Sequence, residues 1–134
     1  MNSDAAKELI ETYVDAFNRG DIDAVCQCFA PNALSFGVLG WGEISKVRPI
    51  WEQLTTSFRM QVRVDSIIAE GNVVAVRLTE SGTFAAPFGE IAPTGKSYDA
   101  VAMEWFEVSD QGIVRRWGSR DTASVLRQLG IPLA

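Results

Sequence analysis

Any acid–base chemistry in this sequence must come from carboxylates, tyrosines, lysines or cysteines, because its 134 residues include no histidine. The usual side chain for proton transfer near pH 7 is therefore absent, as are histidine-based triads and the commonest zinc sites. Cys26 and Cys28, the only cysteines, are two residues apart, which places them on different faces of a helix. That arrangement suits neither a disulfide nor a metal, so we interpret both as buried thiols and expect no metal.

Asp121 is the first candidate for a catalytic carboxylate. The stretch that begins at Gly112 alternates as a strand, so Ile113, Trp117 and Asp121 are expected on one face. A carboxylate beside an indole, at the end of a strand that borders an apolar hollow, can serve as an acid or a base. Aspartate is also a common strand terminator and helix cap, and a short helix is expected from Thr122 onward. Both interpretations stay open.

Glu104 is the second candidate. A strand is predicted over residues 97–108, in which Glu104 shares a face with Phe106 and Glu107 lies on the other face. Because phenylalanine needs burial more than a second glutamate does, we expect Glu104 to project inward, where it can act with Asp121. The opposite register would leave Glu104 in solvent and turn Asp99 or Glu107 inward, and the pattern alone does not exclude it.

Length and composition predict a single globular domain over residues 1–134. The net charge of −5 and the scattered basic residues argue against a nucleic-acid or anionic-membrane partner. No apolar run approaches the roughly 20 residues of a membrane span, and the N-terminus lacks the basic and hydrophobic regions of a signal peptide. We therefore expect a cytoplasmic protein.

Hydrophobic periodicity predicts helices first and strands afterwards, which is typical of an α+β protein. Three N-terminal helices are expected to lie on one face of a curved antiparallel sheet. The expected elements are helices over 4–19, after 21 and over 45–58, a brief strand over 33–36, a long hairpin around Gly71-Asn72, strands over 97–108 and from 112, and a last short helix after 121.

Three stretches carry a resemblance to a known family. They are Tyr13–Asp21 with Phe29–Ala33, then Phe88–Lys96, and then Gly112-Ile113 followed by Trp117, Asp121 and Gln128-Leu129-Gly130. In these stretches the chain resembles the nuclear transport factor 2-like superfamily, whose cone-shaped fold holds a pocket between sheet and helices. Within that superfamily it is similar to the SnoaL-like polyketide cyclases, and the similarity runs nearly from end to end.

The resemblance implies an enzyme without a cofactor that closes a ring by intramolecular aldol condensation on an aromatic polyketide. In that family the aspartate at the place of Asp121 is the acid–base group, paired with a histidine on the preceding strand. This chain has no histidine, and Glu104 can take its place or tune Asp121 through like-charge repulsion. The expected ligand is a small apolar molecule.

Four aromatic residues are candidates for substrate binding: Tyr13, Trp41, Trp117 and Phe88. Tyr13 lies on the apolar stripe of the first helix, so its hydroxyl needs a partner that the pocket or the core can supply. Trp41 serves either as a core anchor or as a pocket wall. Phe88 lies in a loop over residues 84–95 that can close over a ligand or contact another subunit.

Rival functions are separated by what the sequence lacks. Residues 33–42 contain no carboxylate, so the base of a ketosteroid isomerase is missing. Limonene-type epoxide hydrolases need an Asp–Arg–Asp set, and this sequence has no arginine between Arg77 and Arg115 to complete it. A non-catalytic domain that binds a small molecule or dimerises stays open as the alternative. Apolar residues such as Met103 and Trp105, expected on the sheet face away from the helices, predict a homodimer or homotetramer through that face.

Overall fold

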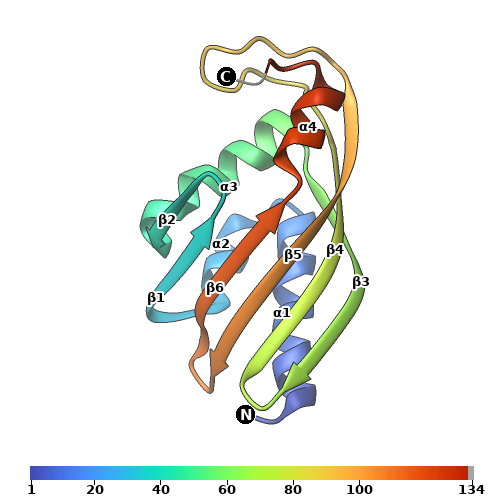
Figure 1. The fold of residues 1–134 in the computed structure, drawn as a ribbon. Helices are drawn as coiled ribbons and strands as arrows, with labels where there is room; N and C mark the ends of the chain where they lie inside the picture. The colour runs from blue at the N-terminus through green and yellow to red at the C-terminus, as the bar shows by residue number, and fades with distance from the viewer. Residues whose placement is uncertain (133–134) are drawn as a thin grey trace.

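The computed structural model describes residues 1–132 and shows an α+β fold (Figure 1). Its elements follow in the order α1 (Ser3–Asn18), α2 (Ile22–Gln27), β1 (Phe29–Gly37), β2 (Gly40–Glu43), α3 (Ile44–Phe58), β3 (Gln61–Glu70), β4 (Val73–Thr83), β5 (Ser97–Ser109), β6 (Gly112–Arg120) and α4 (Thr122–Leu129). Among the described helices, none is long and apolar enough to cross a membrane.

The strands form one curved sheet in the order β2-β1-β6-β5-β4-β3, and α1, α2 and α3 cover one face of it (Figure 1). The predicted long hairpin is confirmed as β3 and β4, which pair antiparallel. The sheet differs from the expectation in two details: it is not antiparallel throughout, and it includes the short strand β2, which was not expected. β1 pairs with β6 in parallel, and Trp41 lies in the short strand β2 opposite Phe36.

Polar side chains fix the first helix at both ends. The N-cap is Asn2, whose side chain accepts from the backbone N–H of Ala5 at 2.8 Å. At the other end Asn18 makes a pair of 2.8 Å hydrogen bonds with the backbone of Val62 in β3. These bonds hold α1 against the sheet and close one end of the layer between them.

The core fills the space between α1, α3 and the concave face of the sheet. Ile10, Val74, Phe106 and Ile113 are fully excluded from solvent there. Burial of such side chains contributes roughly 1.5–3 kcal/mol each before the entropy of ordering is counted. The core therefore anchors the inward-facing positions of β4, β5 and β6, which also carry the polar groups described below.

A bulge in β6 changes which of its residues face inward. Val108 pairs with Ile113 but Glu107 pairs with Arg115, so Val114 is an extra residue without a partner. An extra residue reverses the alternation of side chains beyond it. Ile113, before the bulge, is buried in the core. After the bulge, the inward-facing residues are Arg116, Gly118 and Arg120.

The family-like motifs near the C-terminus join α4 to the sheet. The Gln128 side chain accepts from the backbone N–H of Asp99 at 3.0 Å and donates to the carbonyl of Asp99 at 2.8 Å. Thr94, in the loop between β4 and β5, donates to the carbonyl of Leu129 at 2.8 Å. Gly130 ends the helix with φ of 74°, the left-handed conformation that glycine adopts readily. These residues thus have structural roles.

Candidate functional site

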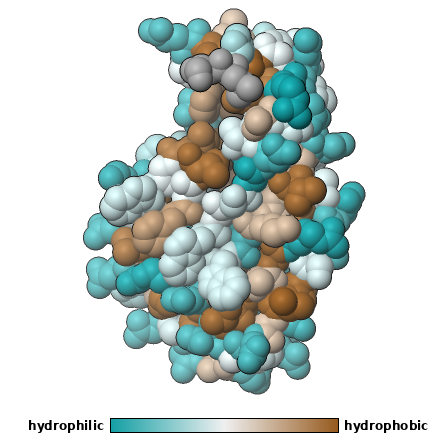
Figure 2. Space-filling model, viewed as in Figure 1, coloured by the Kyte–Doolittle hydropathy of each residue, from teal (hydrophilic) through white to brown (hydrophobic). Residues whose placement is uncertain are grey.

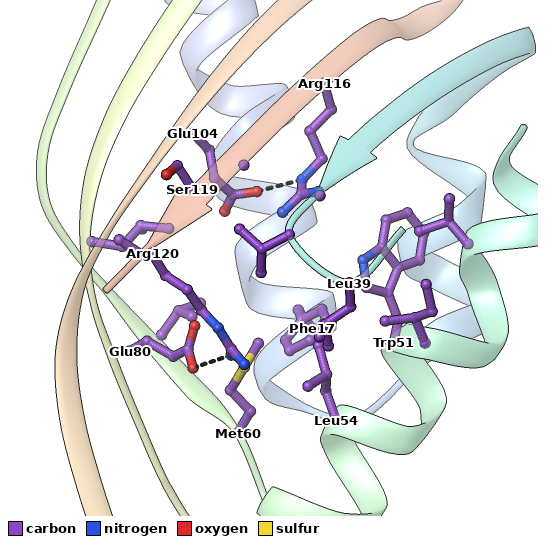
Figure 3. A pocket seen from close by; sticks show the side chains of 18 of the residues that line it. Phe17, Leu39, Trp51, Leu54, Met60, Glu80, Glu104, Arg116, Ser119 and Arg120 are labelled. Atoms are coloured by element: carbon purple, nitrogen blue, oxygen red, sulfur yellow. Dashed lines mark hydrogen bonds and ion pairs between the residues drawn. The ribbon is translucent and has the colours of Figure 1, made fainter. Parts of the chain in front are cut away.

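A cavity of about 80 Å³ lies between the concave face of the sheet and the helices (Figure 3). Its volume is well below the roughly 300–1,000 Å³ of typical ligand pockets, so a large ligand must extend through the open mouth or displace the turn at Val38-Leu39. Most of the wall is apolar, and the exceptions gather in two clusters. The lining includes Tyr13, Phe17, Val38, Leu39, Val47, Ile50, Trp51, Leu54, Met60, Val62, Leu78, Glu80, Ala102, Glu104, Arg116 and Arg120.

The first cluster joins Glu104 of β5 to Arg116 of β6 and Tyr13 of α1. One carboxylate oxygen, Oε1 of Glu104, accepts from Arg116 Nε at 2.5 Å and from the Tyr13 hydroxyl at 3.2 Å. Arg116 also donates from Nη1 to the hydroxyl of Ser35, a fully buried residue of β1, at 3.1 Å. Oε2 of Glu104 accepts no hydrogen bond from the described residues. The cluster thus fixes one oxygen and leaves the other facing the cavity (Figure 3).

The electrostatics of this cluster keep its groups in defined protonation states. Burial is the main cause that raises the pKa of the Tyr13 phenol, and Glu104 raises it further against the opposing effect of Arg116. Burial lowers the pKa of Arg116, but the charge of Glu104 and its hydrogen bond to the guanidinium outweigh this and raise it overall. Tyr13 is therefore a stable neutral donor, and Arg116 a permanent cation, beside the carboxylate.

Gly118 makes room for the guanidinium of Arg116. A Cβ atom at this position would lie 2.5 Å from Nη2 and 2.9 Å from Cζ of Arg116. Distances this short force a shift of one group or the other. The absence of a side chain at Gly118, the next inward-facing residue of β6, thus allows Arg116 to lie where it contacts Glu104.

The second cluster repeats the same three residue types at the other end of the cavity. Glu80 of β4 accepts through Oε2 from the Tyr98 hydroxyl at 2.5 Å and from Arg120 Nη1 at 2.6 Å. Glu80 is 3% exposed, so these two hydrogen bonds replace the water that its carboxylate would bind at the surface. Burial and then the charge of Glu80 raise the pKa of Tyr98. Arg120 Nη1 also lies 3.9 Å from the Met60 sulfur, whereas the buried Nε of Arg120 has no hydrogen-bond partner among residues 1–132.

Two of the residues selected from the sequence lie in this cavity. Glu104 lines it, as the burial of Phe106 on the same face predicted, so the register that would have exposed Glu104 is wrong. Tyr13 also lines the cavity, and its hydroxyl finds its partner there in Glu104.

Asp121 and Trp117 lie elsewhere, and the expectation that both face the pocket is wrong. The bulge at Val114 turns Trp117 to the convex face of the sheet, where it is 40% exposed. Asp121 is exposed and caps α4, accepting from the backbone N–H of Ser124 at 3.1 Å. Of the two interpretations of Asp121, the helix cap is the one that the geometry supports, and Asp121 and Glu104 do not share a cavity.

Trp41 and Phe88 also lie away from the cavity. Trp41 is 62% exposed and stacks on Phe36, with ring centroids 5.8 Å apart. Phe88 packs against Phe58 with centroids 5.0 Å apart, and its backbone pairs with Ile91 within the loop. Both side chains therefore stabilise loops and strand ends rather than line the cavity.

Sequence reasoning missed Arg116, Arg120, Glu80 and Tyr98. The alternation of the strands could have indicated two of them. Glu80 lies on the same face of β4 as Val74 and Leu78, and Tyr98 lies on the same face of β5 as Glu104. The arginines were hidden by the bulge. Because Arg115 and Arg116 are identical neighbours, the hydropathy pattern of β6 is the same whichever of the two faces the cavity.

The convex face of the sheet carries a separate apolar surface. Trp105, Met103, Ile68 and Trp117 are each at least 40% exposed and line a shallow hollow of about 680 Å³. Brown and pale residues gather across this side of the molecule in Figure 2. A monomeric protein rarely exposes a large contiguous apolar area, and the homodimer or homotetramer expected through this face stays a prediction.

Comparisons with known proteins agree on the class of the fold. AclR of Streptomyces galilaeus, provisionally described as a hydroxylase, is 25% identical with a TM-score of 0.87 over 98% of this chain and 100% of its own. IdmH of Streptomyces antibioticus, provisionally described as a polyketide cyclase, is 26% identical with a TM-score of 0.83 over 94% and 99%. An epoxide hydrolase of limonene type from M. tuberculosis is 16% identical, with a TM-score of 0.75 over 95% and 90%, and shares the fold.

Together with the helix-covered curved sheet, these similarities place the chain among the nuclear transport factor 2-like proteins. The family model of the SnoaL-like polyketide cyclases matches residues 7–129, so the chain belongs to that family. A comparison with curated protein sequences gave no match.

Proposed function

We propose that this protein is an acid–base enzyme that closes a ring by intramolecular aldol condensation on an apolar polyketide, with Glu104 as the catalytic base. The observation that carries the proposal is the geometry of Glu104. Tyr13 and Arg116 both bind its Oε1, and Oε2 lies free of hydrogen bonds from the described residues in a cavity whose wall is mostly apolar outside the two clusters. A fixed carboxylate in such surroundings is suited to transfer protons to and from carbon.

The chemistry balances with this one carboxylate. Oε2 of Glu104 takes a proton from a carbon between two carbonyl groups, and the electron pair of the C–H bond becomes the enolate. The enolate carbon attacks the carbon of a third carbonyl group of the same molecule, which forms the C–C bond and moves the π electrons of that carbonyl to its oxygen. That alkoxide then takes the proton back from Glu104. Tyr13 and Arg116 keep Oε1 in place through both transfers.

The apolar wall supplies the second part of the rate increase. Trp51, Leu54 and Phe17 face the two clusters across the cavity (Figure 3). They can hold the two reacting carbons together, which makes an intramolecular reaction more probable than in water. Proton transfer by a positioned group adds roughly 10²- to 10⁴-fold.

The test measures turnover of aromatic polyketide precursors by the wild type and two variants, Glu104→Gln and Asp121→Asn. Glu104→Gln keeps an oxygen for Tyr13 and Arg116 but cannot accept a proton, so its kcat should fall at least 100-fold. Asp121→Asn preserves the helix cap and should keep the wild-type rate. Circular dichroism establishes that each variant is folded at the assay temperature.

The results separate this proposal from two others. If Asp121→Asn abolishes turnover and Glu104→Gln does not, the catalytic group is Asp121, as the family resemblance implied, and the proposed role of Glu104 is wrong. If precursors bind but none is converted by the wild type, the protein is a binding module of the same fold.

A further inference from the structure

Arg120 has a buried donor that no described residue uses. Its Nη1 binds Glu80, whereas its Nε is shielded from solvent and lacks an acceptor. Buried donors are nearly always paired, and an unpaired donor on a cation is especially unfavourable. Nε itself is closed to a water-sized atom, but the side chain lines the cavity and is 13% exposed, so a turn of the guanidinium toward the cavity on binding brings Nε against an oxygen atom of a ligand.

The surroundings of Arg120 define what kind of ligand oxygen can accept a hydrogen bond from its Nε. Glu80 already balances its charge, and the Tyr98 hydroxyl holds the same carboxylate oxygen. With Glu104 and Arg116, the cavity contains two carboxylates and two guanidinium groups. A ligand carboxylate would add an unbalanced charge to a cavity of low polarity. A neutral carbonyl oxygen satisfies the donor without that cost.

The two clusters are separated along the sheet by apolar groups. Arg116 and Arg120 are four residues apart on the inward face of β6, about 13 Å along an extended strand. Leu78 and Ala102 line the cavity, and they pair with each other across β4 and β5. Ala102 is also the residue paired with Arg120, and its small side chain leaves space beside the guanidinium. A ligand that reaches both clusters therefore has an apolar middle.

We infer that Arg120 is a substrate-binding residue that takes a neutral carbonyl oxygen at the end of the cavity away from Glu104. This assignment rests on the proposed function for the identity of the reacting end, and it narrows the substrate class to compounds with carbonyl groups at both ends of an apolar segment. Glu80 and Tyr98 are positioning residues that hold Arg120. No group is transferred at this second cluster.

Binding of two small probes tests the inference without any turnover. The probes are 1-indanone, which has a ketone, and indane, which has the same rings without oxygen. The wild type should bind 1-indanone about 10- to 100-fold more tightly than indane, the value of one hydrogen bond from a charged donor. Titrations followed by calorimetry or by NMR give the dissociation constants.

Two variants locate the preference. Glu80→Gln with Arg120→Met removes both charges together and keeps an oxygen for Tyr98, and it should bind the two probes equally. Arg120→Lys keeps a cation for Glu80 but has no Nε, and its preference for the ketone should fall about tenfold. Arg115→Met, on the same strand with its side chain away from the cavity, is the matched control and should behave as the wild type.

A wild type without preference for the ketone overturns the inference, and so does a preference that survives in Arg120→Lys. If the double variant does not fold, Arg120→Lys alone decides. The outcome is independent of the base, because loss of turnover in Glu104→Gln leaves the binding of 1-indanone at Arg120 unchanged. Conversely, a failed ketone preference leaves the role of Glu104 standing.

Discussion

Replacing Arg116 with methionine tests whether the first cluster is an interdependent unit. The side chains of Arg116 and Glu104 are only 13% and 9% exposed, and Oε1 of Glu104 accepts from Arg116 Nε at 2.5 Å. Methionine fills a similar volume without charge. In Arg116→Met, Glu104 becomes a buried carboxylate whose only remaining partner in the cluster is the Tyr13 hydroxyl, and the buried Ser35 hydroxyl loses its donor.

The expected loss of stability follows from these contacts. Breaking a buried ion pair from one side costs about 3–5 kcal/mol, and the lower end applies because the cavity admits some water. The unpaired Ser35 hydroxyl adds about 1 kcal/mol. A total of about 4 kcal/mol corresponds to a Tm lower by about 14 °C for a chain of this length.

Urea unfolding of a double-mutant cycle measures the effect. Arg116→Met and Glu104→Gln each leave one buried charge uncompensated, whereas the combined variant leaves none and should recover at least about 2 kcal/mol of the summed losses. Arg48→Met is the control, because Arg48 forms exposed ion pairs with Asp23 and Glu52 and its removal should change little. If the losses of unfolding free energy in the two single variants simply add in the combined variant, or if Arg116→Met is as stable as Arg48→Met, then Glu104 and Arg116 do not form an interdependent buried pair.

Three further predictions concern other parts of the structure. Tyr13 and Tyr98 have pKa values raised by burial and by their carboxylates, so folded protein should show no tyrosinate absorbance as the pH passes the ordinary value of 10, and stability should decline above that pH. Gly118→Ala should displace Arg116 and lower kcat at least tenfold with little change in far-UV circular dichroism. Trp105→Glu should convert a dimer or tetramer to monomer in sedimentation velocity; a monomeric wild type contradicts the interface.

The sequence was sufficient to predict the helices and the long strands β3, β4, β5 and β6 because their periods are local. Val74 and Leu78 alternate with polar residues, and each helix has one apolar stripe, so burial alone determines which side faces the core. The inward position of Glu104 followed from the same argument. Parallel pairing of β1 with β6 is non-local, and no pattern within either strand encodes it.

The candidate site was only half predictable, and a single residue accounts for much of the difference. Val114 is inserted without a partner in β6, and strict alternation through that point assigns Trp117 to the pocket and Arg116 to the outside. A bulge leaves no mark on hydropathy when the neighbouring residues, Arg115 and Arg116, are identical. The inward arginines therefore become visible only when β5 and β6 are paired.

The resemblance to the SnoaL-like cyclases was confirmed, but the shared motifs carry the fold more than the chemistry. Gln128, Thr94 and Asn18 each bind backbone atoms of a neighbouring element, and Asp121 caps a helix. Polar residues that satisfy backbone groups recur wherever the same chain path recurs. The tyrosine–glutamate–arginine clusters lie outside those motifs, apart from Tyr13.

Deuterium exchange into a model 1,3-dicarbonyl compound tests the central claim most directly, because it follows removal of the carbon-bound proton without requiring ring closure. In deuterated water we expect the wild type and Asp121→Asn to catalyse exchange at equal rates, and Glu104→Gln to be at least 100-fold slower. Exchange in Glu104→Gln at the wild-type rate would contradict the assignment of Glu104 as the base.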